Sequence, residues 1–89
     1  MKFDLGEVVM TRGISNLMET DFALWIHDCL QRHGNGDWGD LCEEDKQINE
    51  MALKEGDRIL SAYKHDQVKI YIITEYDRSI TTILLAEEY

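Results

Sequence analysis

Three segments in the last third of the chain are rich in β-branched and aromatic residues and are separated by two very short connections. The segments span 58–64, 68–76 and 79–86, and the connections are His65-Asp66-Gln67 and Asp77-Arg78. Such side chains favour strands, and connections this short join antiparallel neighbours. The pattern predicts an antiparallel meander, with 68–76 as its central strand because apolar residues lie on both of its faces.

Two helices are predicted before these strands. The first follows Thr20 or Asp21, either of which can cap its N-terminus, and ends at Gly34. Its apolar residues recur with the helical period and form one stripe: Phe22, Trp25, Ile26, Cys29 and Leu30. Such a stripe is typical of a helix that packs on a core.

The second predicted helix begins at Asp40, where Glu43 completes a capping-box pattern. Its period indicates that Ile48, Met51 and Ala52 face the core. Both cysteines fall in the predicted helices, Cys29 in the first and Cys42 in the second, and buried free thiols are expected at both positions.

The N-terminal residues 2–10 are expected to be extended, with Gly6 at a bulge, and they can add a fourth strand. The chain has no proline, linker or repeat that would mark a second domain. We therefore predict one α+β domain over residues 1–89. In it, an N-terminal extended segment and two main helices pack on one face of an antiparallel three- to four-stranded meander sheet.

Composition limits where the chain works. No apolar run approaches the roughly 20 residues of a membrane span, and charged residues interrupt the N-terminal stretch where a signal peptide is apolar. Two cysteines are too few for a disulfide framework. The sequence thus predicts a cytoplasmic protein with no membrane partner.

Charge limits the partners. The net charge is −9, from 18 acidic and 9 basic residues, and such a surface repels a phosphate backbone. Direct binding of nucleic acid is therefore not expected. Segment 37–57 contains eight acids against Lys46 and Lys54. The segment is either a solvated helix face, which the sequence favours, or a binding surface for a basic partner.

A candidate binding site joins the 33–40 loop to the 75–82 hairpin. Its members offer an imidazole, carboxylates, a guanidinium and an indole: His33, Asp37, Trp38, Asp40, Glu75, Asp77 and Arg78, with the hydroxyls of Thr81 and Thr82 beside them. No nucleophile with a paired base accompanies them, and a His/Asp metal site at this spacing is common by chance. No catalytic residue, metal or cofactor is therefore predicted. In the structural alternative, Arg78 pairs with Asp37 or Glu75 while Trp38 plugs the sheet edge.

Trp38 stands in a loop with glycines on both sides, at Gly36 and Gly39. A lone indole in such a loop exposes apolar area unless it packs. We expect Trp38 to be buried between the two long helices, with its N–H bonded to a carboxylate or carbonyl. The alternative is an exposed indole that serves as a hot spot for a partner.

Several short motifs occur together along the chain: Arg32-His33, Gly36-Asp37-Trp38-Gly39-Asp40-Leu41, Ser61-Ala62-Tyr63, Thr74-Glu75-Tyr76-Asp77-Arg78-Ser79 and the terminal Glu88-Tyr89. In this combination the chain resembles small bacterial hypothetical proteins labelled "plasmid-related", over nearly its whole length. Ala86 departs from the pattern, where a proline is expected. The resemblance implies a mobile-element context and carries no established activity.

The functional hypothesis is a non-enzymatic accessory protein of a mobile element that acts by protein–protein binding. One version is an acidic decoy that occupies the DNA-binding surface of a host defence protein. The alternative is a small metal- or ligand-dependent enzyme that uses the 33–40 loop and the 75–82 hairpin. A further hypothesis is a homodimer, in which strand 79–86 pairs with its copy if it lies at a sheet edge.

Overall fold

The three C-terminal strands form the predicted antiparallel meander. The structure, a computed structural model, describes all of residues 1–89. Strand β3 (Val68–Thr74) is central and pairs on one side with β2 (Ile59–His65) and on the other with β4 (Ile80–Leu85). Alternate residues of each strand point to the same face, so each face of the sheet is set by this register.

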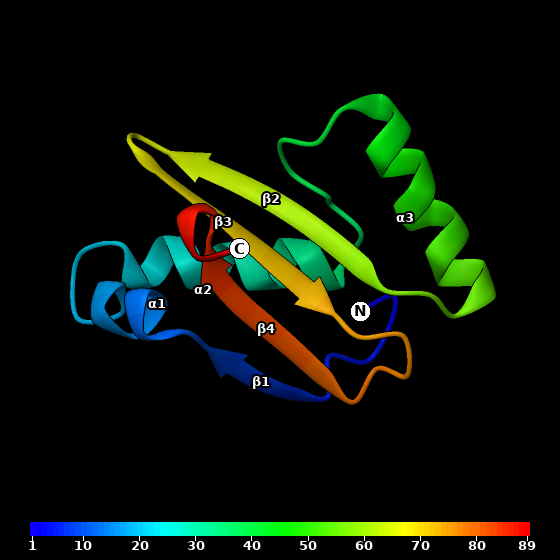
Figure 1. Cartoon of the computed structure of the whole chain (residues 1–89), viewed down its shortest axis with the longest axis horizontal. Coiled ribbons are helices and arrows are strands. Elements are labelled where there is room, and N and C mark those ends of the chain that lie inside the picture. The colour runs from blue at the N-terminus through cyan, green and yellow to red at the C-terminus, as the bar shows by residue number, and fades with distance from the viewer.

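The N-terminal segment does add a fourth strand, but it makes the sheet mixed. Strand β1 (Glu7–Met10) lies beside β4 and runs parallel to it, so the predicted purely antiparallel sheet is wrong. The reason is the long path of the chain, which leaves β1 through helices and two strands before it returns as β4 in the same direction (Figure 1). Gly6 has φ +65°, and a Cβ there would overlap the carbonyl oxygen of Ser79, so the chain passes tightly against the β3–β4 hairpin.

This arrangement also settles the position of the strand proposed for dimer formation. β4 is hydrogen-bonded to β1 on one side and to β3 on the other. The 79–86 strand is therefore not at a sheet edge, and self-pairing through it is excluded. The free edge on that side of the sheet belongs to β1.

One face of the sheet is covered by α1 (Arg12–Leu17) and α2 (Ala23–Gly34), which lies behind the strands in Figure 1. Thr11 caps α1 by accepting the Ile14 N–H. The main core lies between these helices and the inward strand residues: Ile14, Ile26, Cys29, Tyr63, Ile70, Ile72 and Ile83. A short 3₁₀ helix, η1 (Ala86–Glu88), ends the chain on the side of the sheet opposite α2 (Figure 1).

The second long helix, α3 (Glu43–Glu55), lies beyond the edge strand β2 rather than on the same face as α2 (Figure 1). It packs there through a smaller core of Trp38, Ala52 and Ile59. The predicted placement of both main helices on one face is therefore wrong for α3. Neither this helix nor any other combines the length and apolar character needed to cross a bilayer.

The buried side of α3 also differs from the prediction. Ala52 is buried as expected, but Ile48 is 61% and Met51 53% exposed, while Asn49 is buried in their place. The reason is that the Asn49 carboxamide bonds both backbone groups of Leu60 in β2. These two hydrogen bonds turn the helix so that its polar position faces inward.

The N-terminus of α3 is the other departure. The helix begins at Glu43, with Cys42 as its cap residue, because the carboxylate predicted to cap it, that of Asp40, accepts the Lys64 N–H instead. Cys42 is consequently exposed, contrary to expectation, whereas Cys29 is buried as predicted. Burial raises the pKa of the Cys29 thiol to about 12.

Candidate functional site

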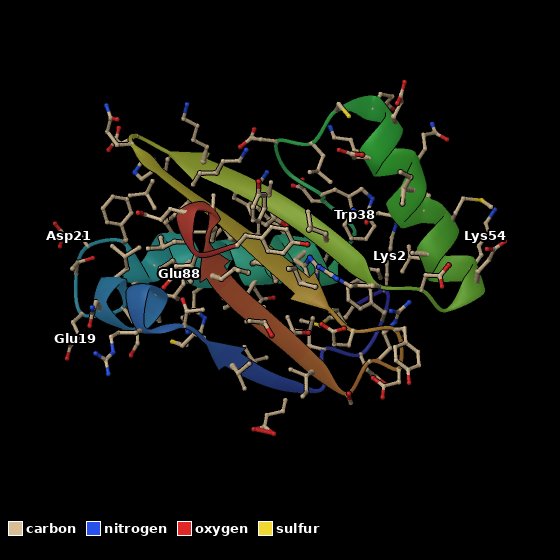
Figure 2. All side chains as sticks on the ribbon, viewed as in Figure 1. Lys2, Glu19, Asp21, Trp38, Lys54 and Glu88 are labelled. Carbon is tan, nitrogen blue, oxygen red and sulfur yellow. The ribbon has the colours of Figure 1, made fainter.

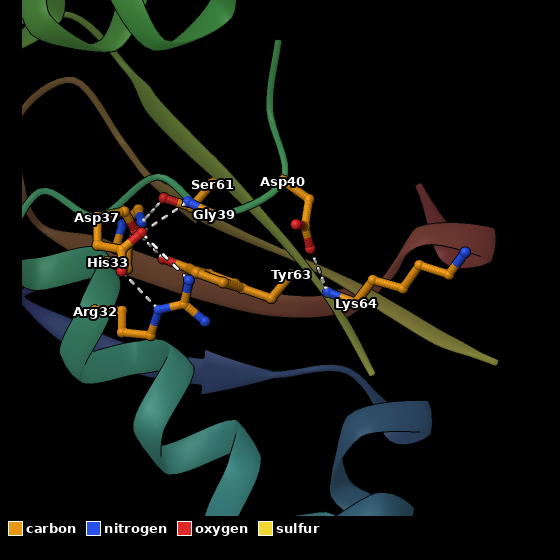
Figure 3. Close-up of polar contacts among 8 residues, drawn as sticks. All are labelled: Arg32, His33, Asp37, Gly39, Asp40, Ser61, Tyr63 and Lys64. Carbon is orange, nitrogen blue, oxygen red and sulfur yellow. Dashed lines mark hydrogen bonds and ion pairs between the residues drawn. The ribbon is translucent and has the colours of Figure 1, made fainter. Parts of the chain in front are cut away.

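The loop after α2 closes the outer edge of the sheet. Ala62 of β2 donates its N–H to the Trp38 carbonyl at 3.2 Å and accepts the Asp40 N–H at 2.7 Å. Lys64 donates its N–H to Asp40 Oδ2 at 2.9 Å (Figure 3). Gly39 has φ +75°, and a Cβ there would overlap the Ala62 carbonyl oxygen, so only glycine permits this approach. Asp40 is thus an edge-sealing residue.

Asp37 shapes the same loop. Its carboxylate receives Arg32 Nε at 2.8 Å and the Gly39 N–H at 3.1 Å, while its carbonyl accepts the Tyr63 hydroxyl at 2.7 Å (Figure 3). The hydrogen bond from Arg32 is the main cause that lowers the pKa of Asp37. The partner of Asp37 is therefore Arg32, and the pairing with Arg78 that the sequence suggested does not occur.

Trp38 confirms the packed alternative. Its side chain is only 4% exposed and lies between β2 and α3 (Figure 2). The indole packs against Phe3 and the edge of His33, and Nε1 donates to Glu50 Oε2 at 2.8 Å. The indole thus joins the end of α2 to α3 with its N–H on a carboxylate, as predicted, and it is not an exposed hot spot.

His33 is fully buried within a chain of hydroxyl groups. Its Nδ1 lies 2.6 Å from Ser61 Oγ and its Nε2 lies 2.9 Å from Thr74 Oγ1. Thr74 Oγ1 is 2.7 Å from Thr81 Oγ1, which donates to the Leu5 carbonyl at 2.6 Å. This series of hydrogen bonds therefore crosses the inner face of the sheet, from β2 to the segment before β1.

The direction of this hydrogen-bond chain places a proton on Nε2 of His33. Because the Leu5 carbonyl can only accept, the Thr81 proton is used there, and Thr74 must donate to Thr81. Thr74 then accepts from His33 Nε2–H. In the neutral imidazole, which is the Nε2–H tautomer, Nδ1 accepts the Ser61 hydroxyl. Burial, with a smaller contribution from the nearby Arg78 guanidinium, lowers the pKa of His33 to about 4.

Arg78 is a backbone clamp in the structure. Its guanidinium donates to the carbonyl oxygens of Ala52 at 3.1 Å, Asp57 at 2.6 Å and Glu75 at 3.1 Å. It therefore holds the C-terminal end of α3 against the β3–β4 hairpin. The pairing expected with Glu75 involves the carbonyl of that residue and not its carboxylate.

Asp77 lies in the turn of the β3–β4 hairpin and stabilises it. Its Oδ1 accepts both the N–H and the hydroxyl of Ser79, which lowers its pKa, and the side chain is exposed. The carboxylate of Glu75 makes no hydrogen bond. These two acids are therefore separate from the buried histidine.

The two segments of the candidate site meet, but in a packed interior. Phe3 joins them, since its ring contacts His33 and Trp38 and lies under the Arg78 guanidinium. None of the seven candidate residues lines any of the three cavities of the molecule. No group of three His, Cys, Asp or Glu side chains is placed to hold a metal ion.

Two of the three cavities lie along α3. A cavity of about 320 Å³ is lined by Leu41, Asp45, Ile48, Asn49, Arg58, Leu60 and Tyr89. A second, of about 240 Å³, shares Ile48 and Arg58 with it and extends to Met51 and Asp57. The sequence placed Ile48 and Met51 in the core, so it missed this surface. One sequence signal could have indicated it. Asn49 lies next to Ile48 in the predicted apolar side of α3, and a polar residue there can face inward and leave its apolar neighbours exposed.

A comparison with models of known protein families, with curated proteins and with solved structures finds no match for this chain.

Proposed function

We propose that this chain is a protein-binding module that uses the exposed side of α3, around Ile48 and Met51, to bind a basic partner. The observation that carries the proposal is the exposure of these two apolar side chains, 61% and 53%, beside two adjoining cavities. Apolar patches that stay exposed on a small domain are typical of interaction sites. Methionine suits such a site because its flexible thioether adapts to different partners.

The acids of segment 37–57 divide into two groups that support this proposal. The carboxylates of three acids accept hydrogen bonds within the fold. Asp37 accepts from the Arg32 guanidinium, Asp40 from the Lys64 N–H of β2, and Glu50 from the Trp38 indole N–H. The other five make no side-chain hydrogen bond: Glu43, Glu44, Asp45, Glu55 and Asp57. These five lie on or beside α3, around the exposed apolar residues.

The partner that fits such a surface has an apolar anchor flanked by lysine or arginine. The anchor would fill the cavity at Ile48, Leu41 and Leu60, while the bases would meet the unbonded acids. Arg58 is the only basic residue that lines the two cavities along α3, and its guanidinium donates to Tyr89 Oη at 2.7 Å. A solvated face alone would explain the acids but not the apolar residues among them.

A finer version of the proposal is the acidic decoy, in which the basic partner is the DNA-binding surface of a host defence protein. Its distinguishing consequence is competition, because duplex DNA and this chain would then occupy the same surface of the partner. This version rests on the mobile-element context implied by the sequence resemblance as well as on the surface of α3.

Site-specific photocrosslinking tests the proposal. A photoreactive benzoylphenylalanine replaces Ile48 in one protein and Leu24 in a control, since Leu24 is 83% exposed on α2. In a bacterial lysate we expect discrete adducts from position 48 that weaken as salt is raised, and none from position 24. Loss of those adducts on adding duplex DNA would support the decoy version. The same adducts at both positions, or none at position 48, would refute the binding surface.

A further inference from the structure

The two edges of the sheet are built differently. At β2 the chain bonds its own edge, through the Trp38–Asp40 segment and the side chain of Asn49. At β1 nothing lies beyond the strand (Figure 1). One edge is therefore sealed by the chain, and the other is left available for pairing.

The backbone of β1 has a regular pattern on its free side. Glu7 and Thr11 point their N–H groups toward the β4 side of the strand. Glu7 donates to the carbonyl of Ser79 and Thr11 to that of Ile83. In a parallel pair alternate residues face the same neighbour, so Val8 and Met10 turn their N–H and C=O groups outward. Two residues with free donors and acceptors thus flank Val9.

The side chains at this edge are apolar on both faces of the sheet. Val8, Val9 and Met10, with Ile80 of β4 beside them, are 36–41% exposed. On the α2 side, Val8 and Met10 line a cavity of about 290 Å³ together with Met18, Ile26, His27, Leu30 and Ile83. An exposed apolar edge strand of this kind is a template for adding another strand.

We propose that β1 pairs antiparallel with β1 of a second copy of this chain, about a two-fold axis at Val9. In that register Val8 lies opposite Met10 of the other copy, and each of the two such pairs exchanges both of its free backbone hydrogen bonds. Val9 faces Val9 in the close, non-hydrogen-bonded position between them. The edge is self-complementary, which is the requirement of an isologous dimer.

The charges at the ends of β1 fit the antiparallel direction. Glu7 falls opposite Thr11 of the other copy and beside its Arg12, and neither Glu7 nor Arg12 takes part in the ion pairs within the chain. A parallel alignment would place Glu7 against Glu7. Glu88 also lies here, because its carboxylate accepts from Thr11. With a net charge of −9 on each copy, the dimer should tighten as salt screens the repulsion.

The dimer goes beyond the proposed function, because it uses the opposite edge of the sheet. The strand order β1-β4-β3-β2 places the two α3 helices at the far ends of the joined sheet. If α3 binds a partner as proposed, the dimer presents two such surfaces. Self-pairing does not depend on that binding, so each can fail without the other.

Disulfide trapping tests the register. In a Cys42→Ser background, Val9→Cys should form a covalent dimer under mild oxidation, because the two Cα atoms face each other at disulfide distance. Met10→Cys is the matched control. It faces residue 8 of the other copy, so it should form no covalent dimer. Equal crosslinking of both variants, or none of Val9→Cys, would overturn the proposed pairing.

Sedimentation of the whole chain tests the backbone contribution. Val8→Pro removes an outward N–H and no bond to β4, so it should keep the thermal melt of the fold and lose the dimer. Val8→Thr keeps the N–H and should dimerise like the natural chain, more tightly at about 0.5 M salt than at low salt. A natural chain that stays monomeric at high concentration and high salt, or a Val8→Pro variant that dimerises equally, would contradict the proposal.

Discussion

The side-chain carboxamide of Asn49 hydrogen-bonds both the backbone N–H and the backbone carbonyl of Leu60. Its Oδ1 accepts the Leu60 N–H at 3.2 Å, and its Nδ2 donates to the Leu60 carbonyl at 2.7 Å. This one side chain therefore satisfies the outward backbone groups of Leu60 in the edge strand β2, and it also sets the rotation of α3 about its axis. Because Asn49 faces inward, Ile48 and Met51 are left outside, so the proposed binding surface depends on this contact.

The first prediction concerns that contact. Asn49→Asp keeps the acceptor but loses the donor and turns a carboxylate oxygen toward the Leu60 carbonyl. We expect a loss of about 1–3 kcal/mol in the free energy of unfolding, measured by urea denaturation. Gln47→Glu is the control, because it makes the same amide-to-carboxylate change at an exposed position of α3 and should be nearly neutral. Equal effects of the two changes would show that Asn49 does not seal the edge.

Gly39 and Gly56 make a matched pair for the second prediction. Both have φ +75°, but a Cβ at Gly39 would overlap the Ala62 carbonyl, whereas nothing lies within 4 Å of one at Gly56. Gly56→Ala should cost only the backbone strain, about 1–2 kcal/mol. Gly39→Ala should cost clearly more, because the loop must also leave β2. Chemical denaturation of the two variants compares them directly, and a similar loss in both would contradict the close approach.

The third prediction concerns Trp38. Trp38→Ala should lower the free energy of unfolding by about 3–5 kcal/mol, since it removes a large buried ring. Trp38→Phe keeps most of the packing but loses the hydrogen bond to Glu50, so a smaller loss is expected. Tyr76→Ala, at an aromatic residue that is 67% exposed, should have little effect. A melting temperature that does not change in Trp38→Ala would place the indole outside the core.

Part of this fold follows from periodicity, and part cannot. The meander was predictable because strand-forming segments joined by very short turns have few alternative pairings. The direction of β1 was not, since an alternating pattern is the same for parallel and antiparallel neighbours. On α3 the apolar residues suggested one buried side, but the two hydrogen bonds of Asn49 and the packing of Trp38 on Ala52 determined another.

The candidate site shows the same limit. Grouping His33 with Trp38 was sound, because the rings of these two residues contact each other. The two residues that bond His33 were missed, although a signal was present: Ser61 and Thr74 are polar residues at inward positions of apolar strands. Arg78 was assigned a carboxylate partner because charge is visible in a sequence. The carbonyl groups that it binds are created only by the fold.

The fourth prediction concerns pH. The folded state lowers the pKa of His33 from the usual 6.5 to about 4, so the folded chain binds fewer protons than the unfolded chain between these values. Stability contributed by neutral His33 is fully present above pH 6.5 and is lost as pH falls toward 4, by roughly 3 kcal/mol in total. Urea denaturation at several pH values measures this loss.

His33→Gln provides the control for that measurement. The carboxyl groups of Asp37, Asp77 and Glu88 also have lowered pKa values, so they reduce stability in acid in both proteins. The difference between the natural chain and His33→Gln isolates the histidine. If both proteins lose the same free energy between pH 6.5 and 4, the buried neutral imidazole is not the cause.

The most direct test of the central claim is the affinity of the crosslinked partner for three proteins: the natural chain, an Ile48→Ser/Met51→Ser variant and a Leu24→Ser control. Titration calorimetry at low and physiological salt measures each one. If the exposed side of α3 binds a basic protein, the double variant should lose at least tenfold in affinity. The control should bind like the natural chain, and affinity should fall as salt rises. Equal affinities for all three proteins, with no dependence on salt, would contradict the claim.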